Sequence, residues 1–159
     1  MNDAMQEIER KFLVPVLPPD LAPTRRRDID QGYVAVDGAT EVRVRRTDDR
    51  YLIAVKSGGG MVRTEVEFEI DRARFAALWE LCTGRRLAKH RLDIPHGSHL
   101  IEVDVYEGPL AGLIVAEVEF ASAQEAEAFT PPSWFGRDIT DDLAFKNSAL
   151  SKLKAPPPG

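Results

Sequence analysis

Residues 7–14, EIERKFLV, form the stretch that decides the fold. Side chains alternate between the two faces of a β-strand, so Glu7, Glu9 and Lys11 share one face. Two carboxylates and an ammonium group are costly to bury together. The same groups suit a metal ion that carries a polyanion, because carboxylates bind hard cations and Lys binds phosphate oxygens. If other strands repeat this pattern, the face is a site; if they do not, it is an ordinary wet surface.

Most of the chain alternates in the same way. Strand-like segments lie at 5–14, 41–46, 51–57, 62–70, 100–107 and 113–120, with weaker ones at 29–36 and 86–94. Their same-face charged groups are Arg43 with Arg45; Lys56; Arg63 with Glu65 and Glu67; Lys89 with Arg91; Glu102 with Asp104; and Glu117 with Glu119. A sheet with one solvated face is the commonest explanation of alternation. Here the polar faces hold almost no Ser, Thr, Asn or Gln, and acids and bases separate by strand, which favours a lumen that holds a metal–polyphosphate complex.

About eight antiparallel strands predict a β-dominated α+β fold, either a barrel or a sandwich with helices packed outside. The sequence predicts a helix over 72–82 capped by Asp71 and one over 123–129 capped by Ser122. A third helix is expected from after Thr140-Asp141 to about Lys152. Segment 15–28 is expected to be a loop. Turns between strands are expected at Asp48-Asp49 and at 57–60.

Composition narrows the class of protein. The chain has 159 residues, 43% of them hydrophobic and 30% charged, which is typical of one globular domain. The net charge of -5 gives no support to nucleic-acid binding, and no apolar run is long enough to cross a membrane. The single Cys82 fits a reducing compartment, and Met1–Ala4 shows no start of a signal peptide, so a cytoplasmic location is expected.

The ordered motifs resemble those of the CYTH superfamily, the triphosphate tunnel metalloenzymes. These motifs are Glu7-x-Glu9-x-Lys11; Gln31-Gly32-Tyr33; Arg43-x-Arg45; Val55-Lys56-Ser57; Arg63-x-Glu65-x-Glu67; Lys89-x-Arg91; Glu102-x-Asp104; Glu117-x-Glu119-Phe120; and Trp134-Phe135-Gly136 with Asp138, Thr140, Lys146 and Asn147. The chain is most similar to the small bacterial inorganic triphosphatases. The similarity lies in its compact length, its N-terminal Ile-Glu-Arg-Lys-Phe-Leu-Val stretch and its Pro-Pro-Ser-Trp-Phe-Gly segment. The resemblance spans about residues 5–152 and implies a closed eight-stranded antiparallel β-barrel. Residues 1–154 are expected to form one tunnel domain, and the proline-rich residues 155–159 are expected to be a disordered tail.

The resemblance also implies roles for individual residues. Phosphate oxygens would be held by Lys11, Arg43, Arg45, Lys56, Arg63, Lys89 and Arg91, with Lys146 reaching into the tunnel. One or two Mg²⁺ or Mn²⁺ ions would be held by Glu7, Glu9, Glu117 and Glu119, with Asp104, Glu65 or Glu67 as further ligands. Lys11 and Tyr33 would form a dyad for proton transfer.

The expected reaction is metal-dependent hydrolysis of inorganic triphosphate to diphosphate and phosphate. A class IV adenylyl cyclase or a thiamine or nucleoside triphosphatase on the same fold is an alternative, and so is a polyphosphate-binding module without catalysis. The expected partner is a small-molecule triphosphate, with no nucleic acid and no membrane. The sequence leaves the oligomeric state open, and a homodimer is compatible with it.

Overall fold

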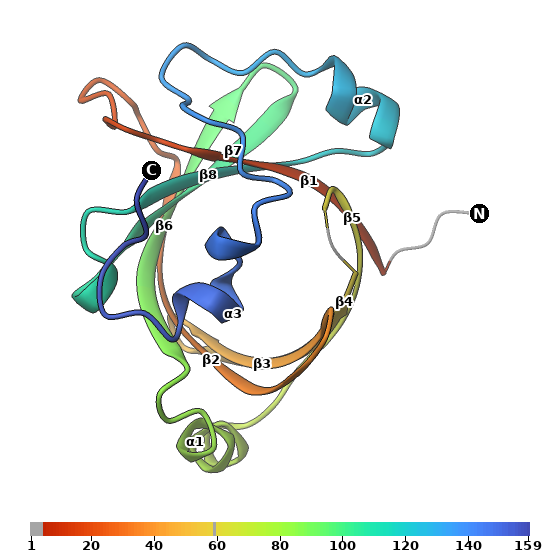
Figure 1. Cartoon of the computed structure of the whole chain (residues 1–159), viewed down its shortest axis with the longest axis vertical. Coiled ribbons are helices and arrows are strands. Elements are labelled where there is room, and N and C mark those ends of the chain that lie inside the picture. The colour runs from red at the N-terminus through yellow and green to blue at the C-terminus, as the bar shows by residue number, and fades with distance from the viewer. Residues whose placement is uncertain (1–4, 59) are drawn as a thin grey trace.

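The strands close into a ring around a central axis in the computed structural model, which describes residues 5–58 and 60–159 (Figure 1). The strands are β1 Gln6–Leu13, β2 Arg25–Asp37, β3 Thr40–Thr47, β4 Arg50–Ser57, β5 Val62–Glu69, β6 Arg86–His96, β7 His99–Tyr106 and β8 Ile114–Glu119. Two of the predictions concern residues outside those described. They are the absence of a signal peptide, which was judged from Met1–Ala4, and the part of the 57–60 turn formed by Gly59.

The ring confirms the predicted closed eight-stranded antiparallel barrel. Its strand order is β1-β5-β4-β3-β2-β6-β7-β8, and every neighbouring pair is antiparallel. The β1–β5 ladder is short, since it pairs only Gln6–Ile8 of β1 with Val62–Thr64 of β5. Because every second side chain points inward, the charged faces of all these strands meet in one lumen.

Two helices pack against the outside of the barrel, as predicted. Helix α1, Arg72–Glu80, begins at Asp71, whose side chain accepts a hydrogen bond from the Arg74 backbone N–H. Helix α2, Ala123–Ala128, begins at Ser122, which caps the Glu125 backbone N–H in the same way. α1 lies over β2, β3 and β4, where Phe75 joins Val44 and Cys82 in a buried cluster. None of the described helices is of a length and apolarity that would let it cross a membrane.

The third predicted helix is wrong in its extent. The segment forms a 3-10 turn η2, Leu143–Phe145, and a short helix α3, Asn147–Leu150, which are separated by Lys146 in an extended conformation (φ -63°, ψ 139°). This break lets the Lys146 Nζ reach Glu41 Oε1 on β3 at 3.1 Å. Phe145 and Leu150 pack with Tyr106 and Val115, so the segment closes one end of the barrel (Figure 1).

The loop predicted over 15–28 ends earlier than expected, because β2 begins at Arg25. Its first residues form ladder pairs with β6, among them Arg25 with Asp93 and Arg27 with Arg91. Arg27 also forms ion pairs with Asp93 and with Glu102 on β7, so partners inside the barrel stabilise this arginine. No local sequence pattern distinguishes such long-range pairing from a solvated run of arginines.

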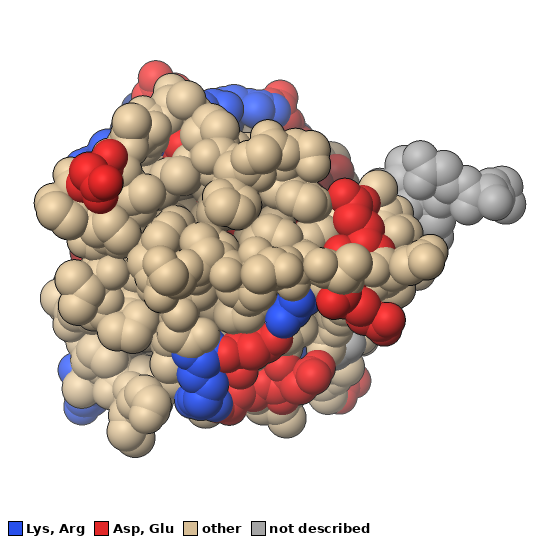
Figure 2. Space-filling view, turned by 90° about the horizontal axis from the view of Figure 1, so that it is seen from above, with Lys and Arg blue, Asp and Glu red and all other residues tan. Residues whose placement is uncertain are grey.

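The centre of the face seen in Figure 2 is mostly uncharged, and charged side chains gather around its margins. Under it, Phe12, Val103, Val118 and other outward-facing residues of β1, β7 and β8 pack with Phe129 and with half-buried Trp134 and Phe135. This cluster holds the wall of the barrel on the acidic side of the lumen. Residues 155–159 contain no helix or strand, and the domain limits drawn from the sequence stay a prediction.

Candidate active site

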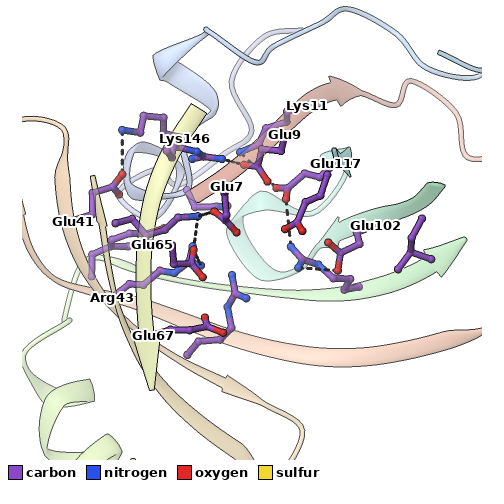
Figure 3. Close-up of a pocket in the computed structure, with 18 residues that line it drawn as sticks. Glu7, Glu9, Lys11, Glu41, Arg43, Glu65, Glu67, Glu102, Glu117 and Lys146 are labelled. Atoms are coloured by element: carbon purple, nitrogen blue, oxygen red, sulfur yellow. Dashed lines mark hydrogen bonds and ion pairs between the residues drawn. The ribbon is translucent and has the colours of Figure 1, made fainter. Parts of the chain in front are cut away.

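The lumen contains a cavity of about 300 Å³ whose lining is almost entirely charged (Figure 3). The lining residues are Glu7, Glu9, Lys11, Tyr33, Glu41, Arg43, Arg45, Lys56, Arg63, Glu65, Glu67, Arg91, Leu100, Glu102, Glu117, Glu119, Lys146 and Asn147. Seven of these side chains are basic and eight are acidic. Small-molecule sites are usually lined by apolar groups, so this lining indicates a ligand that is itself highly charged.

Six acids lie on three adjacent strands and are named the acidic arc: Glu7 and Glu9 on β1, Glu65 and Glu67 on β5, and Glu117 and Glu119 on β8. Carboxylate oxygens of Glu7, Glu9 and Glu119 lie within 4.8 Å of one another. Burial, together with the charges of Glu7, Glu102 and Glu117, raises the pKa of Glu119 to about 7. Among the described residues, Glu119 has no ion pair with a basic group, so its carboxylate lacks a counterion.

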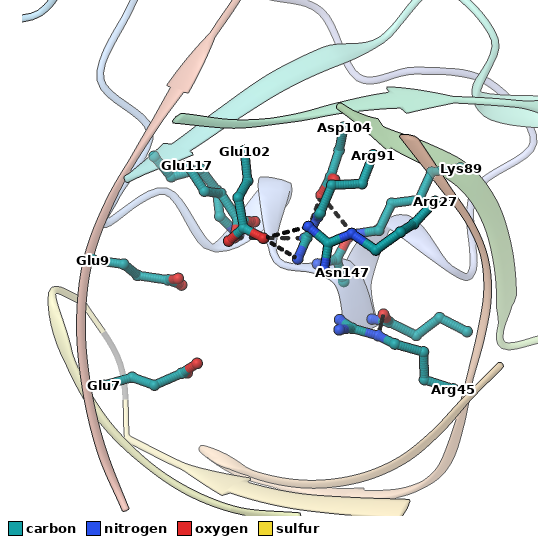
Figure 4. Close-up of polar contacts among 12 residues, drawn as sticks. Glu7, Glu9, Arg27, Arg45, Lys89, Arg91, Glu102, Asp104, Glu117 and Asn147 are labelled. Atoms are coloured by element: carbon teal, nitrogen blue, oxygen red, sulfur yellow. Dashed lines mark hydrogen bonds and ion pairs between the residues drawn. The ribbon is translucent and has the colours of Figure 1, made fainter. Parts of the chain in front are cut away.

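Four bases lie across the lumen and are named the basic arc: Arg43 and Arg45 on β3, Lys56 on β4 and Arg91 on β6. Figure 4 shows Arg45 on the side of the barrel opposite Glu7 and Glu9. Burial and the nearby charges of Arg43 and Arg91 lower the pKa of Arg45 to about 10. Its Nε donates a hydrogen bond to Gln31 Oε1 at 2.9 Å, which leaves the rest of the guanidinium for a ligand.

Ion pairs connect the two arcs where they meet at β4 and β5. Lys56 Nζ lies 2.9 Å from Glu65 Oε2 and 2.9 Å from Glu7 Oε2. Burial opposes ionisation of Glu65, but the charges of Lys56 and Arg43 outweigh it and lower the pKa of Glu65 to about 2. These pairs hold the free side chains in fixed positions inside a lumen where unpaired charges would be destabilising.

Two predicted phosphate ligands, Lys11 and Arg63, stand within the acidic arc. Lys11 Nζ lies 3.5 Å from Glu117 Oε1, and Arg63 forms an ion pair with Glu9. Despite burial, Lys11, Arg91 and other nearby cations lower the pKa of Glu117. The acids are thus ionised where a cation faces them, and Glu119 is the member whose charge is least compensated.

The structure does not bring Lys89 and Asp104 to the cavity surface. Both are fully buried, and Lys89 Nζ lies 2.7 Å from Asp104 Oδ2. Asp104 also accepts two hydrogen bonds from Arg91, Nε to Oδ1 at 2.7 Å and Nη2 to Oδ2 at 2.9 Å (Figure 4). This two-point contact orients the Arg91 guanidinium.

Tyr33 and Lys11, the predicted dyad, both line the cavity but are not hydrogen-bonded to each other in the described part of the chain. Gln31 Nε2 donates to the Tyr33 hydroxyl at 2.7 Å. Burial raises the pKa of Tyr33, although the neighbouring Arg43 opposes the shift. The phenol is therefore neutral at pH 7 and can donate a proton.

The closed end of the cavity contains residues to which the sequence argument assigned no role. Glu41 shares the inward face of β3 with Arg43 and Arg45, so strand alternation could have identified it. It forms the 3.1 Å pair with Lys146. Asn147 accepts a hydrogen bond from the Tyr106 hydroxyl at 2.5 Å, which depends on a long-range contact that no local pattern reveals. Glu102, at the other end, was visible in the strand pattern but was not assigned.

The acidic arc has the donor chemistry of a divalent-cation site. Mg²⁺ and Mn²⁺ prefer carboxylate oxygens, and three converge here. The buried Glu7 Oε2 atom lies 2.9 Å from Lys56 Nζ, so a cation from β4 already faces one side of this cluster. The buried Nε groups of Arg43, across the lumen, and of Arg63, within the acidic arc, lack acceptors among the described residues. These residues fit a cation on one side and an oxyanion on the other.

Comparison with known proteins decides the family. An inorganic triphosphatase of Nitrosomonas europaea is 41% identical over 150 residues, which cover 92% of this chain and 97% of that protein. The chain belongs to the triphosphate tunnel metalloenzymes. An inorganic triphosphatase of Acetivibrio thermocellus is 33% identical over 151 residues, 92% of this chain and 94% of that protein. No family model matches the chain.

Solved structures agree with this membership of the tunnel family. The crystal structure of the inorganic triphosphatase NE1496 superposes with a TM-score of 0.70 at 38% identity, covering 96% of this chain and 97% of that one. A putative adenylyl cyclase from Hippeastrum, HpAC1, described as having a dominant triphosphatase activity, shares the fold at a TM-score of 0.55 and 15% identity, with 76% of this chain and 82% of that chain covered. The tunnel fold of the family is therefore the fold of this chain.

Proposed function

We propose that the protein hydrolyses inorganic triphosphate to diphosphate and phosphate in the lumen, with Mg²⁺ or Mn²⁺. The observation that carries the proposal is the division of one cavity inside the closed barrel into an acidic arc and a basic arc. Two inorganic triphosphatases that match nearly the whole chain support the same substrate. A bare triphosphate alone would add several negative charges to a lining that is already close to neutral, so a cation must accompany it.

Glu7, Glu9 and Glu119 would hold the metal ion, with Glu117, Glu65 and Glu67 as neighbouring carboxylates. When bound, a divalent ion neutralises phosphate charge and lowers the pKa of a coordinated water. Asp104 was also expected among these ligands. Its oxygens are bound by Arg91 and Lys89, so its proposed role is to orient Arg91.

Arg43, Arg45, Lys56 and Arg91 would bind the phosphate oxygens from the basic arc. Arg side chains suit this task because their planar donors match two oxygens at once. Lys11 and Arg63 would bind oxygens from the metal side, and Lys146 from the closed end. Fixed donors that match the charge of the transition state account for most of the catalysis in phosphoryl transfer.

Proton transfer is assigned to Lys11 and Tyr33. Burial raises the pKa of Tyr33 and so keeps its hydroxyl protonated, which suits a role toward the leaving phosphate rather than activation of water. Lys11, held near Glu117 and facing the same cavity, would bind the transferred phosphate group and relay the proton.

The cavity favours inorganic triphosphate over a nucleotide or thiamine triphosphate. Tyr33 is the one aromatic side chain in the described lining, and the residue is only 2% exposed, so it offers no stacking surface to a base or a thiazole ring. Leu100 is the one apolar residue there. The cytoplasmic location expected from the sequence stays a prediction.

Product identification tests the proposal. Purified protein with Mg²⁺ or Mn²⁺ is incubated separately with tripolyphosphate, ATP and thiamine triphosphate. We expect diphosphate and phosphate from tripolyphosphate at a rate well above those for the other two. Cyclic AMP from ATP would identify a cyclase instead. Tight binding of all three without any product would identify a polyphosphate-binding module.

A further inference from the structure

Gln31 lies in the wall of the barrel behind two side chains of the cavity. It is fully buried on β2 and is not among the residues that line the cavity. Its Oε1 accepts a hydrogen bond from Arg45 Nε at 2.9 Å, and its Nε2 donates one to the Tyr33 hydroxyl at 2.7 Å. This buried amide is therefore bonded at one end to a proposed phosphate ligand and at the other to the tyrosine assigned to proton transfer.

The orientation of the Gln31 amide follows from the chemistry of Arg45. A guanidinium Nε–H can only donate, so the end of the amide that faces Arg45 has to be the carbonyl oxygen. The NH2 end then faces Tyr33, and because an amide NH2 group only donates, the phenolic oxygen has to accept. A reversed amide would set two donors against each other, and a buried donor without an acceptor is destabilising.

The direction of this bond determines where the Tyr33 hydrogen points. Since the Gln31 NH2 group occupies one lone pair of the oxygen, the hydroxyl hydrogen has to point elsewhere. Arg43, the ladder partner of Tyr33 on β3, offers only donors, and the nearby carboxylate of Glu41 is paired with Lys146. In the described part of the chain the Tyr33 hydroxyl donates no hydrogen bond to a protein acceptor, and Tyr33 borders the cavity. Its hydrogen is therefore available to an acceptor in the cavity, such as a phosphate oxygen.

The backbone around Gln31 holds this arrangement in place. Gln31 and Arg45 are direct partners in the β2–β3 ladder, so their side chains lie side by side on the inner face. Between Gln31 and Tyr33, Gly32 touches the turn after α1, and a Cβ at Gly32 would lie only 2.7 Å from the Cβ of Cys82. An irregularity of the ladder begins at Tyr33, and bulges of this kind redirect side chains next to active sites. The segment is thus fixed from outside while its polar side chains point inward.

We propose that Gln31 is a positioning residue, which points the Tyr33 hydroxyl hydrogen at the substrate phosphate and holds the Arg45 guanidinium toward the same substrate. The inference rests on the proposed triphosphatase function and adds to it a residue that does not itself touch the substrate. Q31E keeps the shape of the side chain but leaves it with acceptors only. The variant would still accept from Arg45, but it would also accept from Tyr33, so the phenolic hydrogen would turn away from the cavity.

Steady-state kinetics of Q31E with tripolyphosphate and Mg²⁺ tests the proposal. We expect kcat to fall by about 100-fold, the lower end of the loss that follows removal of one preorganised donor, and KM to change less than kcat. Q124E is the control, because it makes the same substitution at an exposed position of α2 outside the barrel, and it should keep the kinetics of the wild type. A kcat of Q31E equal to that of the wild type would overturn the proposal.

A double-mutant cycle separates the positioning of Tyr33 from the effect of an added buried charge. Y33F removes the hydroxyl, so Q31E has nothing left to misdirect, and we expect the kcat of Q31E/Y33F to be close to that of Y33F alone. Q31M is uncharged and of similar length, and it should likewise lower kcat in the wild type but not in Y33F. Losses that multiply in both double variants would show that Gln31 acts independently of Tyr33 and would overturn the proposal. Circular dichroism spectra and melting temperatures identify the folded variants, and Q31M takes the place of Q31E if Q31E is unfolded.

Raman spectroscopy tests the same hydrogen bond without turnover. The intensity ratio of the tyrosine Fermi doublet distinguishes a phenol that accepts a hydrogen bond from one that donates it, and the difference between wild type and Y33F isolates Tyr33 from Tyr51 and Tyr106. Without substrate, we expect a predominantly accepting Tyr33 in the wild type and a donating Tyr33 in Q31E. A donating Tyr33 in the wild type would overturn the proposal. The expected spectra from a wild type that fails to hydrolyse tripolyphosphate would count against the proposed function and not against the orientation of the hydroxyl.

Discussion

The acidic arc and the basic arc contain groups whose pKa values are shifted in opposite directions. In the acidic arc, burial and crowded carboxylates raise the pKa of Glu119 to about 7. In the basic arc, burial and crowded guanidinium groups lower the pKa of Arg45 to about 10. Each shift moves a group toward its neutral form, although a group of opposite charge lies across the same cavity. The protein holds its acids and bases apart rather than pairing all of them, and a metal–triphosphate complex would supply the missing charge to both sides.

The largest effect is expected from removing one acid of the metal cluster. E9Q keeps the size of the side chain but removes its charge and should lower metal-dependent turnover by about 100-fold or more, since even indirect partners of a metal site contribute 10–100-fold. Phosphate release at varied Mg²⁺ concentration measures the loss. The control E69Q changes an exposed acid of β5 that pairs with Arg50 outside the cavity. Near-normal turnover in E9Q would contradict the metal assignment.

Removing a base from the basic arc should weaken binding of the substrate rather than binding of the metal. R45Q loses charge-assisted hydrogen bonds worth about 1.5–3 kcal/mol each, so the KM for triphosphate should rise about 10- to 100-fold. The Mg²⁺ concentration that gives half-maximal rate should stay close to that of the wild type. R50Q is the control, because Arg50 is exposed and outside the cavity. If R45Q instead weakened the metal requirement with KM unchanged, the two arcs would not have separate roles.

The raised pKa of Glu119 predicts a pH dependence of metal binding. Below about pH 7 Glu119 holds a proton that a metal ion must displace, so the increase in Tm caused by Mg²⁺ should be small at pH 5 and level off above pH 7. Without metal, the raised pKa works the other way: its contribution to stability declines as pH rises from the normal Glu value toward 7. E119Q should show neither trend. A Tm increase of equal size at pH 5 and pH 8 in the wild type would show that Glu119 does not bind the metal.

The smallest effect is expected at the closed end. Lys146 already pairs with Glu41 at 3.1 Å, so K146M removes a cation that is partly neutralised and should change kcat/KM by about 10-fold or less. Steady-state kinetics with tripolyphosphate measures the change. A loss as large as that of E9Q would place the reacting phosphate at this end rather than between the arcs.

The barrel and most of the cavity could be predicted because the physical rule involved is local. Strand alternation alone places Glu7, Glu9 and Lys11 on one face, and the same rule applies to the Arg and Glu pairs of the other strands. Strand alternation alone left a barrel or a sandwich open, and the resemblance to the tunnel family supplied the closed ring. The caps at Asp71 and Ser122 were visible for the same reason, since capping depends on neighbours within three residues.

What could not be predicted depends on contacts between distant residues. By its local sequence Arg27 belongs to a run of arginines typical of a solvated loop, but pairing of β2 with β6 brings it to Asp93 and Glu102. Lys89 and Asp104 follow the inward pattern, yet their mutual ion pair keeps them below the cavity surface. The helix expected at the C-terminal end breaks at Lys146, because that residue contacts Glu41 on a strand more than a hundred positions away.

Anomalous scattering from a crystal soaked with Mn²⁺ and tripolyphosphate tests the division of the lumen most directly. We predict a manganese peak among the carboxylates of Glu7, Glu9 and Glu119, and phosphate density that extends from it to Arg43 and Arg45. Manganese bound away from these three acids, or phosphate that makes no contact with the basic arc, would contradict the account.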